Sequence, residues 1–154
     1  MSIKDMFHGC ELFFDMYDEE IENLVKSQLV HHIEPSDYLI KEGDTGDQVF
    51  IVLDGIMEIT KQTDQGEFVV EKLKHRDVFG VLMLIDTYPY SVSIKSKTRS
   101  SVLEIKHKDI MALFQKKPQV FSVISLNISR LLAKRLRNAH MAITKAMKEN
   151  SKAA

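Results

Sequence analysis

Apolar residues are spaced in two ways along this chain, and the change separates a central strand region from flanking helices. Between residues 38 and 105, short apolar runs alternate with turns rich in glycine and aspartate, such as Asp54-Gly55 and the run 64–66. The run 49–53 is apolar without interruption, which is typical of a strand buried on both faces. Many short strands at close spacing predict a jelly roll or barrel. The expected strands cover residues 31–34, 38–41, 48–53, 56–60, 68–70, 92–94 and 102–105.

Helical spacing begins and ends the chain. Residues 2–14 are expected to form a short helix or turn, and a further helix begins at Asp18, where acidic residues suit the positive end of the helix dipole. After the last strand, a helix with Ile110 and Leu113 on one face is expected to end before Pro118.

The longest helical pattern runs from Pro118 to about residue 149, and its proline stands at the first helical position, where proline is tolerated. At about 1.5 Å per residue, this helix is long enough to extend beyond a small domain. We therefore expect one domain made of a body, residues 1–117, and a C-terminal helix, residues 118–150.

The overall composition is that of an ordinary globular protein, but the charges are unevenly distributed. The chain has 154 residues, 44% of them hydrophobic and 28% charged, with a net charge of −1. Residues 1–60 carry fourteen acids and three bases, whereas residues 115–154 carry nine bases and one acid. This asymmetry predicts either that the two ends pair with each other or that the basic end binds an acidic partner.

The sequence carries no signal for export or for membrane insertion. Its single cysteine, Cys10, precludes an intramolecular disulfide and fits a reducing compartment. Residues 1–10 lack the apolar run of a signal peptide, and no stretch is long enough to cross a bilayer. We expect a cytoplasmic protein with no membrane insertion.

One block of turn and strand residues is more specific than the rest. Residues 42–55 read EGDTGDQVFIVLDG. This block resembles the Glu-Gly-Asp-x-x-Asp-x-hydrophobic-aromatic-Ile-Val-x-x-Gly pattern of the cyclic nucleotide-binding domain family. The resemblance extends from about residue 12 to about residue 136. It implies a mainly β fold with flanking helices: the cyclic nucleotide-binding β-roll, a jelly roll, with N-terminal helices and a long C-terminal helix.

A second block, residues 79–91, reads FGVLMLIDTYPYS and resembles the phosphate-binding cassette of the same family. Its glycine opens a short helical turn, whose first backbone N–H groups form an anion site. In the family, a glutamate after this glycine holds the ribose 2′-hydroxyl, and a later arginine holds the cyclic phosphate. These positions are Val81 and Tyr90 here, so the frame of a nucleotide pocket lacks both charged contacts.

The missing contacts weaken the expected binding of cAMP or cGMP. A charge-assisted arginine–phosphate contact contributes on the order of 1.5–3 kcal/mol, and its loss corresponds to about ten- to several-hundred-fold weaker binding. Tyr90 supplies no positive charge, and Met83 is expected to crowd the pocket floor. The degenerate pocket then consists of Phe79, Gly80, Val81, Leu82, Met83, Tyr90, Ser91 and Arg135.

The long helix carries a basic group whose role has two interpretations. In the family this helix lies over the ligand, so that Arg135 can supply the missing cation. We favour the alternative, a solvated basic face of an amphipathic helix formed by Arg130, Lys134, Arg135 and Arg137. The resemblance also implies a homodimer through this helix, with the apolar residues Ile124, Ile128, Leu131, Leu132, Leu136, Ala139 and Ile143.

Motifs for other chemistries are absent from the sequence. Cupin enzymes share the roll and bind metal through His-x-His, but His31 and His32 are adjacent and point to opposite faces of a strand. There is no nucleophile elbow, Walker loop or Cys/His pairing, and no recognition helix or zinc-finger spacing. We expect no enzymatic activity, no metal, no cofactor and no direct nucleic-acid binding.

Two functional hypotheses follow. The first is a stand-alone regulatory or scaffolding module, with no DNA-binding or other output domain, that has lost the usual ligand contacts and binds another signalling or scaffold protein. The second is a small-molecule sensor that binds a cyclic nucleotide or another ligand through backbone N–H groups, Ser91 and Arg135. A third, weaker hypothesis is a DNA-binding regulator whose reading domain lies on another chain.

Overall fold

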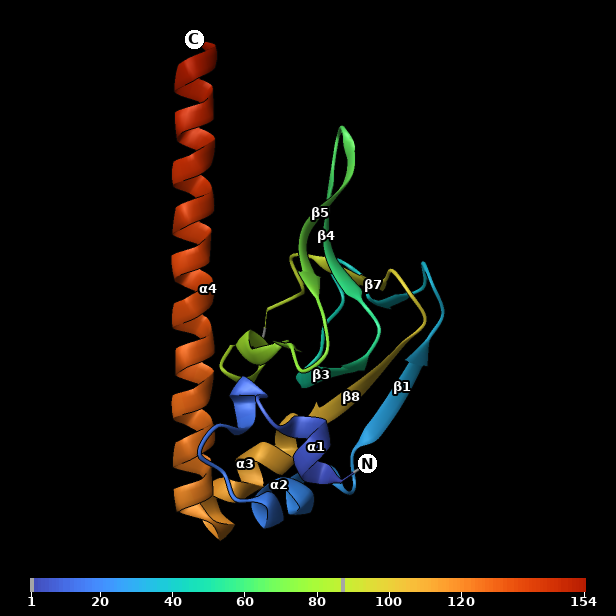
Figure 1. Cartoon of the computed structure of the whole chain (residues 1–154), viewed down its shortest axis with the longest axis vertical. Helices are drawn as coiled ribbons and strands as arrows, with labels where there is room; N and C mark the ends of the chain where they lie inside the picture. Colours follow the sequence, from blue (N-terminus) through green and yellow to red (C-terminus); the bar gives the residue numbers. More distant parts are fainter. Residues whose placement is uncertain (1, 87) are drawn as a thin grey trace.

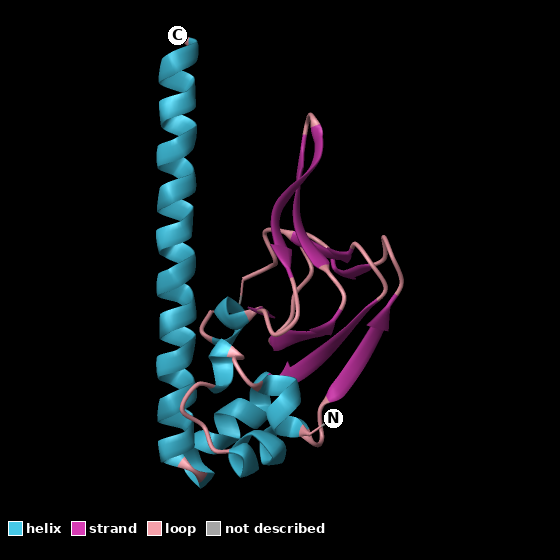
Figure 2. Ribbon diagram, in the orientation of Figure 1, coloured by secondary structure: helices cyan, strands magenta, loops and turns pink. Residues whose placement is uncertain are grey.

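Two antiparallel sheets form the centre of the molecule, with short helices at one end and one long helix along the side (Figure 1; Figure 2). The structure is a computed structural model that describes residues 2–86 and 88–154. One sheet has the order β1 (Leu29–Ile33), β8 (Ser100–Lys106), β3 (Gln48–Asp54), β6 (Val78–Phe79). The other has the order β2 (Tyr38–Ile40), β7 (Ser93–Ser96), β4 (Met57–Thr63), β5 (Gly66–Leu73). The predicted β-roll with flanking helices is confirmed.

The helices lie where the sequence placed them. Before the sheets come α1 (Ile3–Phe7), the 3-10 turn η1 (Glu11–Phe13) and α2 (Asp18–Val25). A second 3-10 turn, η2 (Val81–Leu84), follows β6, and α3 (His107–Lys116) follows β8. The long helix α4 (Pro118–Ala153) ends at Ala153, four residues beyond the predicted end at about residue 149. Among the described residues, no helix has both the length and the apolarity of a membrane span.

Strand β3 is buried on both faces, as its uninterrupted apolar sequence predicted. Val49 and Ile51 belong to the core between this sheet and the helices, which we call the helix-side core. Phe50 and Val52 face the opposite way, into the core between the two sheets, which we call the roll core. Successive residues of a strand point to opposite faces, so one strand contributes to both cores.

Helix α4 completes the helix-side core, and this changes the interpretation of its apolar face. Ile124 is 0% exposed, and Ile128 and Leu131 are also buried in this core. These three residues were predicted to form the dimer face, but their side chains are already covered within one chain. Of the predicted set, Leu136 and Ile143 are exposed, and Ile143 is 57% exposed.

The hairpin of β4 and β5 leaves apolar side chains exposed. Its residues 68–70 form a strand as expected, yet Phe68, Val69 and Val70 are exposed. Figure 1 shows the reason: the end of this hairpin extends beyond the body of the roll, in the same direction as the C-terminal half of α4. A strand pattern therefore predicts the strand here, but not a partner for its apolar side chains.

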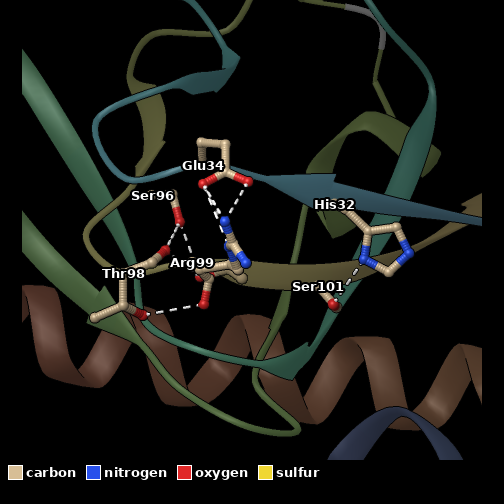
Figure 3. A network of polar contacts seen from close by, with 7 residues as sticks. His32, Glu34, Ser96, Thr98, Arg99 and Ser101 are labelled. Atoms are coloured by element: carbon tan, nitrogen blue, oxygen red, sulfur yellow. Dashed lines mark hydrogen bonds and ion pairs between the residues drawn. The ribbon is translucent and has the colours of Figure 1, made fainter.

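The corner between β7 and β8 explains one glycine of the block 42–55. Gly55 has φ +84°, and a Cβ there would lie 2.2 Å from Ser100 Oγ. Ser96 Oγ donates a hydrogen bond of 2.8 Å to that same Ser100 oxygen. Next to this buried pair, Arg99 Nη2 donates to Glu34 Oε2 at 3.2 Å on the surface (Figure 3). Close packing together with positive φ requires glycine at this turn.

A pair of variants on α4 tests the assignment of its faces. We expect Ile124→Ala to lower the free energy of unfolding by about 2–5 kcal/mol, because it removes fully buried methyl groups and leaves a cavity. Leu126→Ala, two residues further on the same helix and 51% exposed, should cost about 1 kcal/mol or less. Urea unfolding followed by circular dichroism measures both, and equal costs would contradict the assigned orientation of α4.

Candidate functional site

The cassette keeps the backbone geometry that its sequence predicted. Strand β6 ends at Phe79, Gly80 has φ +86°, and η2 begins at Val81. A Cβ on Gly80 would lie 2.6 Å from the Gln48 carbonyl oxygen of β3, so only glycine fits this turn. Thr87, within the cassette sequence, lies outside the described residues.

Apolar side chains occupy the positions around this turn. Val81 is completely buried and belongs to the helix-side core, and Met83 is buried as well. Phe79 lies in the roll core, where its ring stacks on Phe50 with centroids 5.0 Å apart. The side chain of Leu82, within η2, is exposed to solvent. A glutamate in place of Val81 would therefore put a carboxylate into apolar packing.

Tyr90, to which the resemblance assigns the role of the phosphate-binding arginine, turns its side chain into the roll. The ring packs against the roll core, and the hydroxyl is buried with no hydrogen-bond partner among residues 2–86 and 88–154. The backbone is fixed on both sides: Tyr90 N donates to the Asp44 carbonyl oxygen, and Gly43 N donates to the Tyr90 carbonyl oxygen, each at 2.8 Å.

The surroundings of this hydroxyl are negatively charged. Burial, together with the carboxylates of Asp47, Glu104 and Asp44, raises the pKa of Tyr90 to about 12. Each of these groups disfavours a further negative charge at the same place. The position that the resemblance assigns to a cyclic phosphate is therefore apolar on one side and acidic on the other.

A lysine that the sequence did not single out lies at the edge of the cassette. Lys61 of β4 donates to the Ser91 carbonyl oxygen at 2.7 Å and forms an ion pair with Glu42. The hydrogen bond from Lys61 lowers the pKa of the Glu42 carboxyl. This cation is thus already shared between a carboxylate and a carbonyl. The predicted contact of Ser91 with a ligand stays a prediction.

Arg135 reaches the cassette from α4 but contacts the backbone. Its guanidinium donates to the carbonyl oxygen of Val78 in β6, and the side chain is half-buried. The prediction of a solvated basic face therefore does not hold for this residue. Its positive charge lies beside the strand that leads into η2, outside the roll core.

The other three members of the predicted basic group are Arg130, Lys134 and Arg137. They are exposed and lie beside the N-terminal segment. Lys134 forms an ion pair of 2.7 Å with Glu11, and the Arg130 guanidinium lies 5.5 Å from the centre of the Phe14 ring. Among the described residues, one ion pair thus joins the basic end of the chain to the acidic end, as the first of the two outcomes predicted from the charge asymmetry requires. Arg137 lies one turn beyond them.

The two adjacent histidines point apart, as expected on a strand. His31 Nε2 pairs with the Glu104 carboxylate, whereas His32 Nδ1 lies 3.1 Å from Ser101 Oγ (Figure 3). Within the part of the chain that the structure describes, no group of three or more His, Cys, Asp or Glu side chains is arranged to hold a metal ion.

Comparison with known proteins agrees with this geometry. Residues 30–133 match the family model of the cyclic nucleotide-binding domain. The chain is 32% identical over 88 residues to the cAMP-dependent protein kinase regulatory subunit of Yarrowia lipolytica, covering 57% of this chain and 23% of that protein. It is 27% identical over 108 residues to the potassium channel AKT2/3 of Arabidopsis thaliana, covering 70% of this chain and 14% of the channel. The chain thus spans less than a quarter of the length of either relative.

Solved structures share the fold at lower sequence identity. A cyclic nucleotide-binding domain from Methylobacillus flagellatus has a TM-score of 0.81 at 22% identity, covering 93% of this chain and 81% of that one. The catabolite activator protein of Thermus thermophilus has a TM-score of 0.76 at 23% identity, covering 87% of this chain and 62% of that one. Since the family match extends over well more than half of the sequence, the chain belongs to the cyclic nucleotide-binding domain family.

Proposed function

We propose that this chain is a regulatory module that acts by binding other proteins and that no longer binds cAMP or cGMP as its family does. The similarity to a kinase regulatory subunit and to potassium channels supports a regulatory role without catalysis. The observation that carries the proposal is Tyr90, whose ring packs against the roll core. The resemblance assigns this position to the phosphate-binding arginine.

Electrostatics at Tyr90 add to the steric argument. A cyclic nucleotide brings a negatively charged phosphate, and the nearby carboxylates include Glu104, whose side chain is mostly buried. Two like charges about 5 Å apart repel by about 3 kcal/mol at an effective dielectric constant of about 20. In the family, the arginine at this position attracts the phosphate. Tyrosine supplies no positive charge, so the carboxylates nearby leave the position with a net negative charge.

One observation favours the alternative, a sensor for a different small molecule. The buried Tyr90 hydroxyl has no partner among the described residues, and it can donate one hydrogen bond to a ligand. The acidic surroundings would favour a neutral or cationic ligand over a nucleotide. The titration below tests the loss of nucleotide binding that this alternative shares, and the Tyr90→Phe variant tests whether the hydroxyl is without a partner.

The exposed part of α4 supplies a surface for a second copy of the chain. Leu136, Ala139, Ile143 and Met147 are exposed and follow one another at spacings of three, four and four residues, which places them along one side of the helix. This part of α4 extends past the helix-side core (Figure 1). An apolar seam of this kind pairs with a matching helix, and we infer a homodimer through residues 136–147.

Titration calorimetry with cAMP, cGMP and cyclic dinucleotides tests the loss of nucleotide binding. We expect no binding tighter than about 10 μM, roughly −7 kcal/mol. Tyr90→Arg should strengthen cAMP binding at least about ten-fold, because it restores the cation and opens the roll. Tyr88→Arg adds the same charge two residues earlier at an exposed side chain and should leave binding unchanged. Tight binding by the natural sequence would refute the proposal.

Removal of single hydroxyl groups tests the placement of Tyr90. We expect Tyr90→Phe to raise the free energy of unfolding by about 1 kcal/mol, because it removes a buried polar atom without a partner. Tyr38→Phe is the matched control and should lower stability, since the Tyr38 hydroxyl donates to Glu67 Oε2 at 2.6 Å. Urea unfolding at neutral pH measures both variants. A destabilising Tyr90→Phe would mean that the hydroxyl has a partner.

Alkaline pH provides a second measurement on the same variant. The folded-state pKa of Tyr90, about 12, lies above its ordinary value of 10.0, so the folded state disfavours the tyrosinate. The stability that follows from this shift is complete below about pH 10 and is lost as the pH rises towards about 12. The natural protein should therefore lose more stability over this interval than Tyr90→Phe does. Identical pH profiles would contradict the shift.

Analytical ultracentrifugation tests the inferred homodimer. We expect the natural protein to sediment as a dimer and Ile143→Glu to raise the dissociation constant at least about ten-fold, because the variant puts a charge into the apolar seam. Met141→Glu makes the same change at another exposed apolar residue of α4, away from the seam, and should leave the dimer intact. A dimer unaffected by Ile143→Glu would exclude this interface.

A further inference from the structure

A second concave site lies between the N-terminal segment and α4. This cavity has a volume of about 670 Å³, within the range of about 300–1,000 Å³ that is typical of small-molecule sites. Its apolar lining includes Phe7 of α1, Phe13 of η1, Ile21 of α2 and Leu131 of α4, all of which are buried residues. The apolar part of the cavity is therefore built from four separate elements.

The α4 wall of this cavity is basic. Arg130, Lys134 and Arg137 follow one another at spacings of four and three residues, so they lie on one face of the helix and line the cavity together. Arg130 Nη1 donates to the Asn127 amide oxygen at 3.2 Å. Among residues 2–86 and 88–154, Arg137 forms no ion pair, and neither does Lys4 of α1, a further lining residue.

The acidic lining residues lie on the opposite wall. Glu11 pairs with Lys134, Asp15 lies between η1 and α2, and Asp18 opens α2. Asp18 is the first residue of α2, where the helix dipole favours a negative charge. The cavity thus has cations along α4, carboxylates along the N-terminal segment and apolar residues between them. A negatively charged head group would find its attractive partners on the α4 wall.

We propose that this cavity binds an amphiphilic anion, with an unbranched alkyl chain against the apolar lining and a carboxylate or phosphate head at Arg130 and Arg137. An arginine guanidinium matches the planar geometry of a carboxylate and the oxygens of a phosphate. Each methylene buried in an apolar site strengthens binding by about three- to four-fold. A chain of moderate length therefore supplies most of the affinity, and the head group supplies the orientation.

Occupancy of this cavity would strengthen the contact between the N-terminal segment and α4. That contact already depends on Asn127, which is buried and donates to the carbonyl oxygens of Leu12 at 2.9 Å and Phe14 at 2.8 Å. A ligand touching both walls adds to these bonds. The site is separate from the cassette, since none of its lining residues belongs to residues 79–91.

Cys10 offers an internal reporter of occupancy. It is the single cysteine of the chain, it lines the cavity, and it is buried. Burial raises the pKa of its thiol to about 11, so that alkylation at neutral pH is slow and depends on transient opening of the N-terminal segment. A ligand that fills the cavity should slow this alkylation further.

Titration of the full chain with single-chain amphiphiles, below their micelle concentrations, tests the proposal. Decanoate and decyl phosphate serve as the anions, decylammonium as the cation with the same tail, and octanoate as the shorter anion. We expect decanoate to bind about ten-fold more tightly than octanoate and at least ten-fold more tightly than decylammonium, and to slow Cys10 alkylation.

The comparison of decanoate with decyl phosphate identifies which anionic head the site prefers. Equal binding of decanoate and decylammonium would overturn the charge assignment, and no binding of either anion below about 1 mM would overturn the site.

A matched pair of charge reversals locates the head group. Arg137→Glu changes an exposed cation that lines the cavity and should weaken decanoate binding about three- to ten-fold. Lys148→Glu makes the same change eleven residues later, about three turns along the same face of α4, and should have no effect. Both positions are exposed, so neither variant disturbs a core. Equal effects of the two variants would show that the anion does not bind at this wall.

Discussion

Strand β3 separates two apolar cores, and the arrangement of the whole chain depends on this burial. Val49 and Ile51 hold the N-terminal helices, α3 and the first part of α4 against the sheet, while Phe50 and Val52 hold the two sheets together. Apolar side chains on both faces of a central strand are buried only if the helices cover one face and the second sheet covers the other. The helices are therefore part of the body of the domain and not appendages to the roll.

The same strand fixes the backbone of the turn between β6 and η2. Gly80 approaches the Gln48 carbonyl oxygen so closely that a side chain does not fit, and Phe79 stacks on Phe50. The glycine and the aromatic residue are thus required by packing against β3, whether or not a ligand is bound. Val81, in the helix-side core, and Tyr90, against the roll core, are the two positions to which the resemblance assigns charged ligand contacts.

Apolar spacing predicted the strands and helices well, because each element buries a face with its own period. The site was predictable only in part. Its position along the chain identified Tyr90, but the sequence did not indicate that the ring enters the roll core. Nor did it indicate that Lys61 reaches Ser91, thirty residues away, since that contact depends on how the strands pair. Helical spacing placed Ile124 on the apolar face of its helix. It did not say what covers that face, because an intramolecular core and a dimer interface require the same spacing.

The two halves of α4 differ in how much of their surface the rest of the chain covers. The first half is embedded in the helix-side core up to Leu131 and is tied to β6 through Arg135, whereas residues 136–153 are exposed. Those eighteen residues form an arm of about 27 Å at about 1.5 Å per residue. A tilt of about 10° at Arg135 would displace the tip of this arm by roughly 5 Å. A small rotation of α4 beside β6 would therefore become a displacement of several ångströms at the C-terminal end of the helix.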